Sequence, residues 1–193
     1  MNRSSIINNN GHLSVDKEVK LTLLLYEDYE CENCGSAFVE LKALREYFKE
    51  NVCVVYRNFP CTYSHPSSLL AALVAEASGL QKKFIEVHDT ILELQSYLEY
   101  GLGGILRIIE KKYAISIKQL MEDIENPHLK TKVNDDIECG VQMGVKKTPT
   151  IFINNNLYNG PVKFGALSKT VVSNLKINSV LQNGEQLKNN GEH

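Results

Sequence analysis

The sequence predicts an α/β fold in which a long series of helices separates two groups of strands. Residues 21–26 form a short, almost wholly apolar run, which is typical of a strand buried on both faces. Residues 51–60 form a second run, rich in β-branched side chains. A third apolar run, residues 150–153, comes only after several segments with helical patterns. This order predicts one sheet whose chain is interrupted by a helical insertion.

The first helix is expected directly after the first strand. Phe38, Leu41, Leu44 and Phe48 recur at three- and four-residue spacing, which is the pattern of an amphipathic helix that ends near residue 50. Because this helix lies between the first two strands, we expect the strands to be parallel, as in a β-α-β unit.

Helical patterns fill most of the stretch between the second and third strands. The expected helices cover residues 67–78, 81–100, 105–113, 117–125 and 127–143. A hairpin over residues 154–160 and a last helix over 164–177 follow the third strand. The chain then divides into a loose N-terminal arm (1–11), a first α/β part with a cysteine pair (12–62), an inserted helical domain (63–143), a second α/β part (144–177) and a polar C-terminal tail (178–193).

Composition sets the broad class of the protein. The chain has 193 residues, of which 43% are hydrophobic, so it can build one substantial core. A formal net charge of −2 gives no reason to expect a nucleic-acid partner. No apolar run approaches the length of a membrane span, so we expect no membrane insertion. The first residues lack the apolar region of a signal peptide, which predicts a cytoplasmic protein as written and a periplasmic one if a signal was removed.

Cys31 and Cys34 fall where the first strand ends and the first helix begins. The first turn of a helix carries unpaired N–H groups and the positive end of the helix dipole, and both lower the pKa of a thiol placed there. The spacing lets Cys34 close a disulfide with Cys31, or release a substrate from a mixed disulfide. We therefore interpret Cys31 as the more exposed, attacking thiol and Cys34 as the more buried, resolving thiol.

Half of a zinc site and a chance pair are the alternatives to a redox pair. A structural zinc site normally needs four protein ligands, and the other cysteines are scattered as Cys53, Cys61 and Cys139. The strand–Cys-x-x-Cys–helix context favours redox chemistry, with no metal and no bound cofactor. Cys53 and Cys139 are expected to pack, whereas Cys61 lies in a turn-rich loop and is the candidate for a second redox or dimer-forming thiol.

Several short motifs, taken in order, resemble the DsbA-like branch of the thioredoxin superfamily, which includes disulfide-bond formation proteins. The motifs lie at residues 26–34 around the cysteine pair, 56–60, 65–66, 84–89 and 144–154, and the resemblance covers about residues 12–176. The resemblance implies a thioredoxin fold with an inserted helical domain, the helices forming a cap over a four- or five-stranded sheet. It also implies a thiol–disulfide oxidoreductase that acts on extended or unfolded polypeptides and is recycled by a redox partner.

The resemblance also assigns roles to further residues. It makes Thr148-Pro149 a cis peptide that faces Cys31 and contacts substrate, whereas base rates alone favour a trans bond. It implies a carboxylate beneath the cysteines as proton acceptor, a place that Glu27 or Asp28 can fill. His65 stands in a loop that either lies beside the cysteines and modulates them or has a structural role.

The dipeptide between the cysteines departs from the family's strong oxidants, which often carry Pro-His. Here it is Glu32-Asn33, with further acidic residues before Cys31. Since like charge raises the pKa of a thiol, we expect a pKa of Cys31 nearer to that of a free thiol than in those oxidants, and a more reducing couple.

Two other functions remain open from the sequence. One is a glutathione-dependent transferase or isomerase on the same fold, although such relatives generally use a single serine or cysteine. The other is a non-enzymatic metal-binding or adaptor domain. The direction of exchange depends on the redox poise of the compartment and the recycling partner. No separate dimerisation segment is visible, which favours a monomer.

Overall fold

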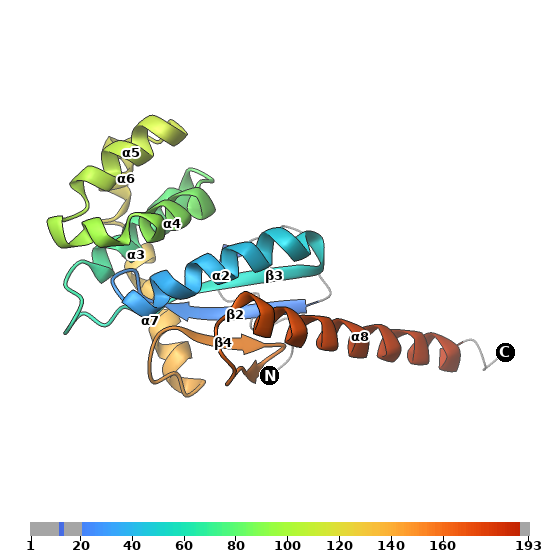
Figure 1. The fold of residues 1–193 in the computed structure, drawn as a ribbon. Coiled ribbons are helices and arrows are strands. Elements are labelled where there is room, and N and C mark those ends of the chain that lie inside the picture. The colour runs from blue at the N-terminus through green and yellow to red at the C-terminus, as the bar shows by residue number, and fades with distance from the viewer. Residues whose placement is uncertain (1–11, 14–20, 190–193) are drawn as a thin grey trace.

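The computed structural model describes residues 12–13 and 21–189, so the predicted N-terminal arm (1–11) lies outside the described residues. A five-stranded sheet forms the centre of the molecule, with the strand order β1-β3-β2-β4-β5 (Figure 1). Strand β2 pairs in parallel with β3 and antiparallel with β4, which confirms the predicted β-α-β unit. The strands are β1 (His12–Leu13), β2 (Leu21–Glu27), β3 (Val52–Asn58), β4 (Thr150–Ile153) and β5 (Asn156–Leu157).

Helices surround this sheet, and those between β3 and β4 form the predicted insertion. The helices are α2 (Glu32–Phe48), α3 (Ser68–Leu80), α4 (Phe84–Glu93), α5 (Gly103–Tyr113), α6 (Ile117–Asp123), α7 (Pro127–Gln142) and α8 (Phe164–Asn189), with 3-10 helices η1 (Lys49–Asn51) and η2 (Gln95–Tyr100). In Figure 1, α3 to α6 gather beyond one end of the sheet, while α2 runs along one of its faces. The α/β class with inserted helices is confirmed.

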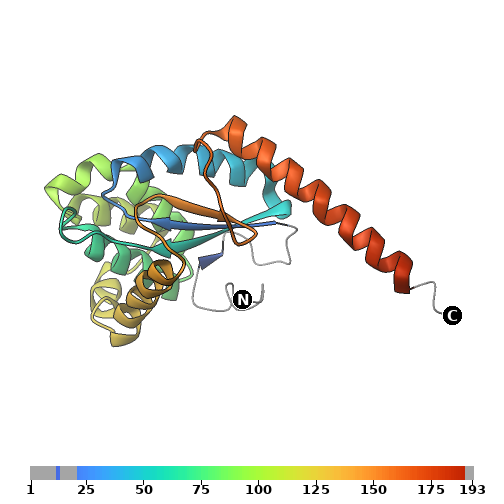
Figure 2. The same ribbon diagram turned by 90° about the horizontal axis from the view of Figure 1, so that it is seen from below.

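Two helices differ from the sequence prediction. The segment 81–100 is divided at Leu94 into α4 and η2, because the chain turns there and brings Gln95 against the start of α2. The last helix does not end at residue 177 but continues to Asn189, so most of the predicted polar tail is helical. Polar side chains do not interrupt a helix, and no proline stands between residues 178 and 189 to end it. Figure 2 shows α8 projecting away from the sheet.

The sheet separates a large hydrophobic core from a small one, because side chains alternate between its two faces. Leu21, Leu23 and Leu25 belong to the large core, which includes buried residues of α2 and α8. Leu24 and Tyr26 belong to the small core on the other face. This arrangement fixes the carboxyl end of β2, where the cysteine pair follows.

A buried polar cluster joins the insertion to the sheet. Arg57 of β3 donates to Asp136 of α7 over 2.6 Å, and the backbone N–H of Asn58 donates to the same carboxylate over 3.0 Å. The side chain of Asn58 also donates to Glu76 of α3 over 2.7 Å. Buried charges are tolerated only when they are paired in this way, so the cluster sets the position of the inserted helices against β3.

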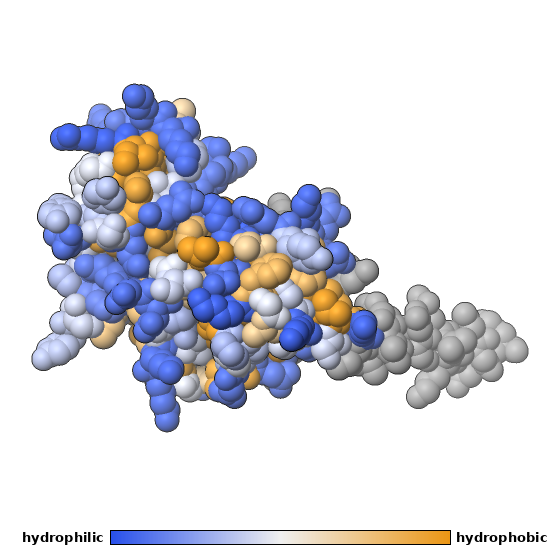
Figure 3. Space-filling model, in the orientation of Figure 1, coloured by the Kyte–Doolittle hydropathy of each residue, from blue (hydrophilic) through white to orange (hydrophobic). Residues whose placement is uncertain are grey.

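The surface shows no single continuous apolar region on the face seen in Figure 3, where hydrophobic side chains form separate patches among hydrophilic ones. Among the residues that the structure describes, no helix is long and apolar enough to cross a membrane. The same residues contain no group of three or more His, Cys, Asp or Glu side chains arranged to hold a metal ion.

Candidate active site

The cysteine pair lies at the junction between β2 and α2, as predicted. Cys31 is the N-cap residue of α2, and its backbone carbonyl accepts from the N–H of Cys34 over 2.8 Å. Both cysteines are free thiols. Cys31 is 9% exposed and Cys34 is 1% exposed, so the predicted order of burial is confirmed.

A second segment, far away in the sequence, completes the site. The Thr148–Pro149 peptide is cis, as the resemblance implies. The Cys31 thiol donates to the backbone carbonyl of Thr148 over 3.5 Å, across 117 positions of sequence. The fold therefore places the loop before β4 directly against the more exposed sulfur.

The two thiols differ strongly in acidity. A hydrogen bond from the Cys34 thiol, together with hydrogen bonds from Thr148 and the N-terminal N–H groups of α2, lowers the pKa of Cys31 to about 5, although burial opposes this. Burial above all, and then the hydrogen bond to Cys31 and the charge of Glu27, raise the pKa of Cys34 well above its usual range. The Cys31 sulfur is thus able to act as a nucleophile. The Cys34 sulfur stays protonated unless a base accepts its proton.

The acidic residues around Cys31 have less influence than the sequence suggested. The pKa of about 5 lies far below that of a free thiol, about 8.5, yet above that of DsbA, about 3.5. Hydrogen bonds to the sulfur dominate, and burial is the main effect that opposes them. Glu32 and Asn33 are exposed on the first turn of α2, where water screens their effect.

The structure separates the two candidate carboxylates at the end of β2. Glu27 is buried, its charge acts on Cys34, and its Oε1 lies 2.6 Å from His88 Nε2. Asp28 is also buried, but its side chain is directed at the loop of residues 61–68. Its carboxylate accepts from the backbone N–H of Cys61 over 2.7 Å and from Ser68 Oγ over 2.6 Å. Glu27 is therefore the one of the two carboxylates whose charge acts on Cys34.

His65 is brought to the site by Asp28. Its Nδ1 lies 2.7 Å from Asp28 Oδ2, and this hydrogen bond raises the pKa of His65. The charge of Cys31 acts in the same direction, so the imidazole lies within electrostatic reach of that sulfur. Cys61, in the same loop, is exposed, and its thiol accepts from Ser64 Oγ over 3.2 Å.

Sequence reasoning missed Gln95 as a residue of the site. Its Nε2 donates to the backbone carbonyls of Tyr29 and Cys31, over 2.7 and 2.9 Å. It also lies against Gly35, where a Cβ atom would collide with the Gln95 amide. A glycine directly after the second cysteine is the only signal for this close approach, and it does not identify the partner.

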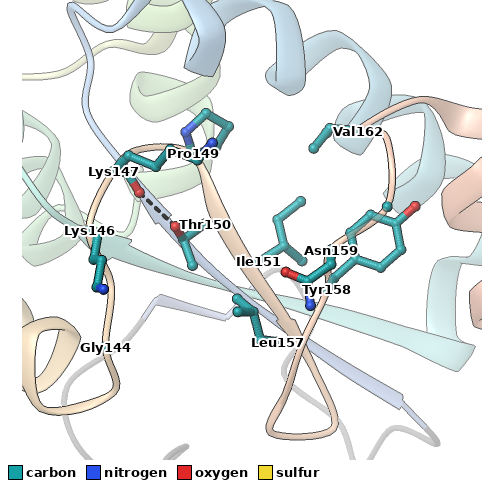
Figure 4. Close-up of a pocket in the computed structure, with 11 residues that line it drawn as sticks. Gly144, Lys146, Lys147, Pro149, Thr150, Ile151, Leu157, Tyr158, Asn159 and Val162 are labelled. Atoms are coloured by element: carbon teal, nitrogen blue, oxygen red, sulfur yellow. Dashed lines mark hydrogen bonds between the residues drawn. The ribbon is translucent and has the colours of Figure 1, made fainter.

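A groove of about 530 Å³ extends from Pro149 along β4 and β5. Figure 4 shows lysine side chains near the start of β4 and the side chains of Leu157, Tyr158 and Val162 across the groove. The Thr150 hydroxyl donates to the backbone carbonyl of Lys147 over 2.6 Å and so holds the loop that carries Pro149. The groove is open, partly apolar and continuous with the cis-proline loop.

The Cys31 thiolate is expected to form near pH 5, because hydrogen bonds stabilise it. The absorbance of the thiolate at 240 nm, measured in the wild type minus Cys31→Ser, should rise with a midpoint near that pH. In Cys34→Ala the midpoint should move upward, since the largest stabilising hydrogen bond is lost. A wild-type midpoint above about 7 would contradict this assignment, because free thiols titrate near 8.5.

Comparisons with known proteins agree with this geometry. Residues 9–172 match a protein family described as Thioredoxin. A thioredoxin-like oxidoreductase from Silicibacter pomeroyi has 25% sequence identity and a TM-score of 0.74, over 91% of this chain and 98% of that chain. BdbD from Bacillus subtilis has 20% identity and a TM-score of 0.75, over 86% of this chain and 94% of that chain. The alpha-DsbA1 of Wolbachia pipientis has 16% identity and a TM-score of 0.76, over 90% of this chain and 94% of that chain.

Curated relatives match over only part of their length. A protein named Na(+)/H(+) antiporter NhaA 1, from Mycobacterium sp. strain KMS, is 31% identical over 156 residues, which are 78% of this chain and 24% of that protein. The chain thus spans about a quarter of the length of the curated relatives that it matches. The family match covers most of the chain, and it agrees with the Cys-x-x-Cys junction, the cis-proline loop and the interrupted sheet. The chain belongs to the thioredoxin family and has the fold of the DsbA-like structures.

Proposed function

We propose that the protein is a thiol–disulfide oxidoreductase that exchanges disulfides with extended polypeptides or with a redox protein through Cys31 and Cys34. The observation that carries this proposal is the position of the two thiols, because Cys31 caps the start of α2 against the Thr148 carbonyl and is more exposed than Cys34. These contacts lower the pKa of Cys31, while burial raises that of Cys34. A nucleophilic thiol next to a protonated resolving thiol is what the exchange reaction needs.

The exchange proceeds in two steps. The Cys31 thiolate attacks one sulfur of a substrate disulfide, and the other substrate sulfur leaves as a thiolate. Cys34 then loses its proton to Glu27 and attacks Cys31, which forms the Cys31–Cys34 disulfide and releases the first substrate sulfur. The reverse sequence oxidises a dithiol substrate. No bound cofactor is required, since the two cysteines carry the electron pair.

The groove next to Pro149 is the proposed substrate site. An extended polypeptide can lie along β4 and β5 with its sulfur at Cys31 and its backbone against Thr148. The apolar wall suits side chains of unfolded chains, while Lys146 and Lys147 favour acidic or neutral segments. Three further residues are the proposed modulators of this sulfur. The backbone N–H of Asn33 stabilises the thiolate, the charges of His65 and Cys31 act on each other, and exposed Glu32 has a screened, weaker effect. The predicted more reducing couple and the monomeric state remain part of this proposal.

Reduction of insulin by dithiothreitol tests the proposal. The wild type is expected to shorten the lag before insulin B chains precipitate, and Cys31→Ser is expected to behave like the buffer control. Equal acceleration by both proteins would assign the activity to another thiol. No acceleration by either would direct attention to the metal-binding alternative, which a zinc measurement on the purified protein then examines.

A further inference from the structure

A continuous row of polar groups leads from the neighbourhood of Cys34 to the surface between α2 and α4. Glu27 Oε1 lies 2.6 Å from His88 Nε2, and His88 Nδ1 lies 3.0 Å from Asp89 Oδ1. Arg45 Nη2 donates to Asp89 Oδ2 over 2.5 Å, and Lys42 Nζ lies 3.5 Å from the same oxygen. Every contact along this row is within the range of a hydrogen bond or an ion pair.

From His88 outward, the exposure of the side chains in the row increases. The side chains of Glu27 and His88 are 3% and 0% exposed, that of Asp89 is 11% exposed and that of Lys42 is 30% exposed. One end of the row is therefore sealed beneath the cysteine pair and the other end reaches water. Among the residues that the structure describes, His88 is the link between the buried Glu27 carboxylate and the Asp89 carboxylate.

Aromatic rings enclose the His88 imidazole. Phe84 stacks on it with a centroid separation of 5.6 Å, Tyr56 lies at 4.2 Å, and Tyr29 and Phe38 approach edge-on. In such surroundings a net charge is costly, so charges must be balanced within the pocket. The titratable and charged groups around it come from β2 (Glu27), the turn that follows (Tyr29), α2 (Cys34, Lys42, Arg45), β3 (Tyr56), α3 (Glu76) and α4 (Asp89).

We propose that His88 is a positioning residue for the resolving step, which fixes the Glu27 side chain through its Nε2 and gives up its own Nδ1 proton to Asp89 when Glu27 takes the proton of Cys34. The inference rests on the proposed function. It adds a residue that the reaction depends on and an exit for the proton at the edge of α4.

The proton balance of the step is simple. The S–H bond of Cys34 breaks, its proton binds to a Glu27 oxygen, and its sulfur attacks Cys31. The Cys31–substrate S–S bond breaks, and the electron pair leaves with the substrate sulfur, which is protonated from water. Glu27 becomes neutral, so it no longer stabilises the positive charge on His88. His88 then loses its Nδ1 proton to Asp89, which passes it to water.

This exchange leaves the Glu27–His88 pair electrically neutral both before and after the step. Before the step, the anion of Glu27 balances the cation of His88, and after it both are uncharged. Burial lowers the pKa of His88, but the charge of Glu27 and the hydrogen bonds to both carboxylates outweigh burial and raise it to about 9. Arg45 and His88 hold the pKa of Asp89 well below its usual range against the effect of burial, so Asp89 does not retain the proton.

Reaction with a substoichiometric amount of 5,5′-dithiobis(2-nitrobenzoate) separates the two steps. Attack by Cys31 releases one coloured thiolate, and attack by Cys34 on the mixed disulfide releases a second. Every protein carries Cys61→Ser and Cys139→Ser, since Cys61 is exposed and Cys139 is half-buried. His88→Gln is expected to slow the second release about tenfold or more at pH 7, within the range of general-base effects, and to leave the first within about twofold. In His88→Gln the rate of the second release should also rise steadily with pH, whereas this rate in the parent protein should stay nearly constant.

Two further variants distinguish this role from a structural one. Asp89→Asn keeps a hydrogen-bond acceptor for Nδ1 but cannot take up the proton, so it should also slow the second release. Phe84→Leu removes the ring stacked on His88 but no link of the row, so both releases should match the parent. Thermal unfolding of each variant shows whether it is folded.

Three outcomes would overturn the inference. One is a folded His88→Gln whose second release matches the parent from pH 5 to 9, and another is an equal slowing in Phe84→Leu. If His88→Gln does not fold, an unchanged second release in Asp89→Asn decides against the role. A parent protein that shows no first release contradicts the proposed function instead, and the inference falls with it.

Discussion

Exchange of Cys34 for serine is expected to turn the protein from a catalyst into a covalent trap. Cys31 keeps a thiolate-favouring environment at the start of α2, so it still attacks a substrate disulfide. The serine hydroxyl cannot resolve the product, and the mixed disulfide should persist. Incubation with insulin or with scrambled ribonuclease should give an adduct on a non-reducing gel that dithiothreitol removes, while the wild type shows almost none.

Matched variants identify the sulfur in the adduct. The double variant Cys31→Ser/Cys34→Ser should give no adduct, and Cys34→Ser/Cys61→Ser should give as much as Cys34→Ser alone. Cys61 is exposed, so it is the thiol most able to imitate the result. If the adduct disappeared with Cys61→Ser and survived Cys31→Ser, the loop thiol would be the nucleophile and the proposed roles would be wrong.

Replacement of Asp28 by alanine is expected to lower the free energy of unfolding by about 3–5 kcal/mol, because several donors lose one buried acceptor. Its Oδ1 accepts from Ser68 Oγ and from the backbone N–H of Glu30, over 2.6 and 2.9 Å. Its Oδ2 accepts from the N–H of Cys61 over 2.7 Å and lies as close to His65 Nδ1. Urea unfolding followed by circular dichroism at 222 nm measures the loss.

Asp28→Asn and Glu32→Ala are the controls for this effect. Asparagine keeps one acceptor oxygen, so it should lose clearly less stability than alanine. Glu32 is exposed four residues away, and its removal should change the free energy of unfolding by less than about 0.5 kcal/mol. Losses below about 1 kcal/mol in Asp28→Ala would show that the carboxylate does not organise the loop from Cys61 to Ser68.

The two acidic neighbours at the end of β2 therefore have separate tasks. Glu27 contacts His88 beneath Cys34, whereas Asp28 ties the loop of residues 61–68 to the turn before Cys31. The sequence alone left both residues as candidates for a single role. The side chains of consecutive residues at a strand end point to opposite faces of the sheet. Only the tertiary packing shows which partner each side chain contacts.

The sequence by itself determined the elements and their order. The apolar run of β2, the amphipathic spacing of α2 and the cysteine pair between them are local patterns, so they predicted the junction and its chemistry. The same local patterns gave wrong ends for α4 and α8. Where a helix ends depends on contacts and hydrogen bonds that the polarity of the sequence does not encode.

Only the tertiary structure decided the partners within the site. Cys31 meets Thr148 across 117 positions, Glu27 meets His88 across 61, and Asp28 meets His65 across 37. No periodicity or motif states which buried acid pairs with which histidine, since the pairing depends on how the inserted helices pack against the sheet. The pKa of Cys31 depends on the fold as well, because hydrogen bonds from the Cys34 thiol, from Thr148 and from the first N–H groups of α2 lower it against burial.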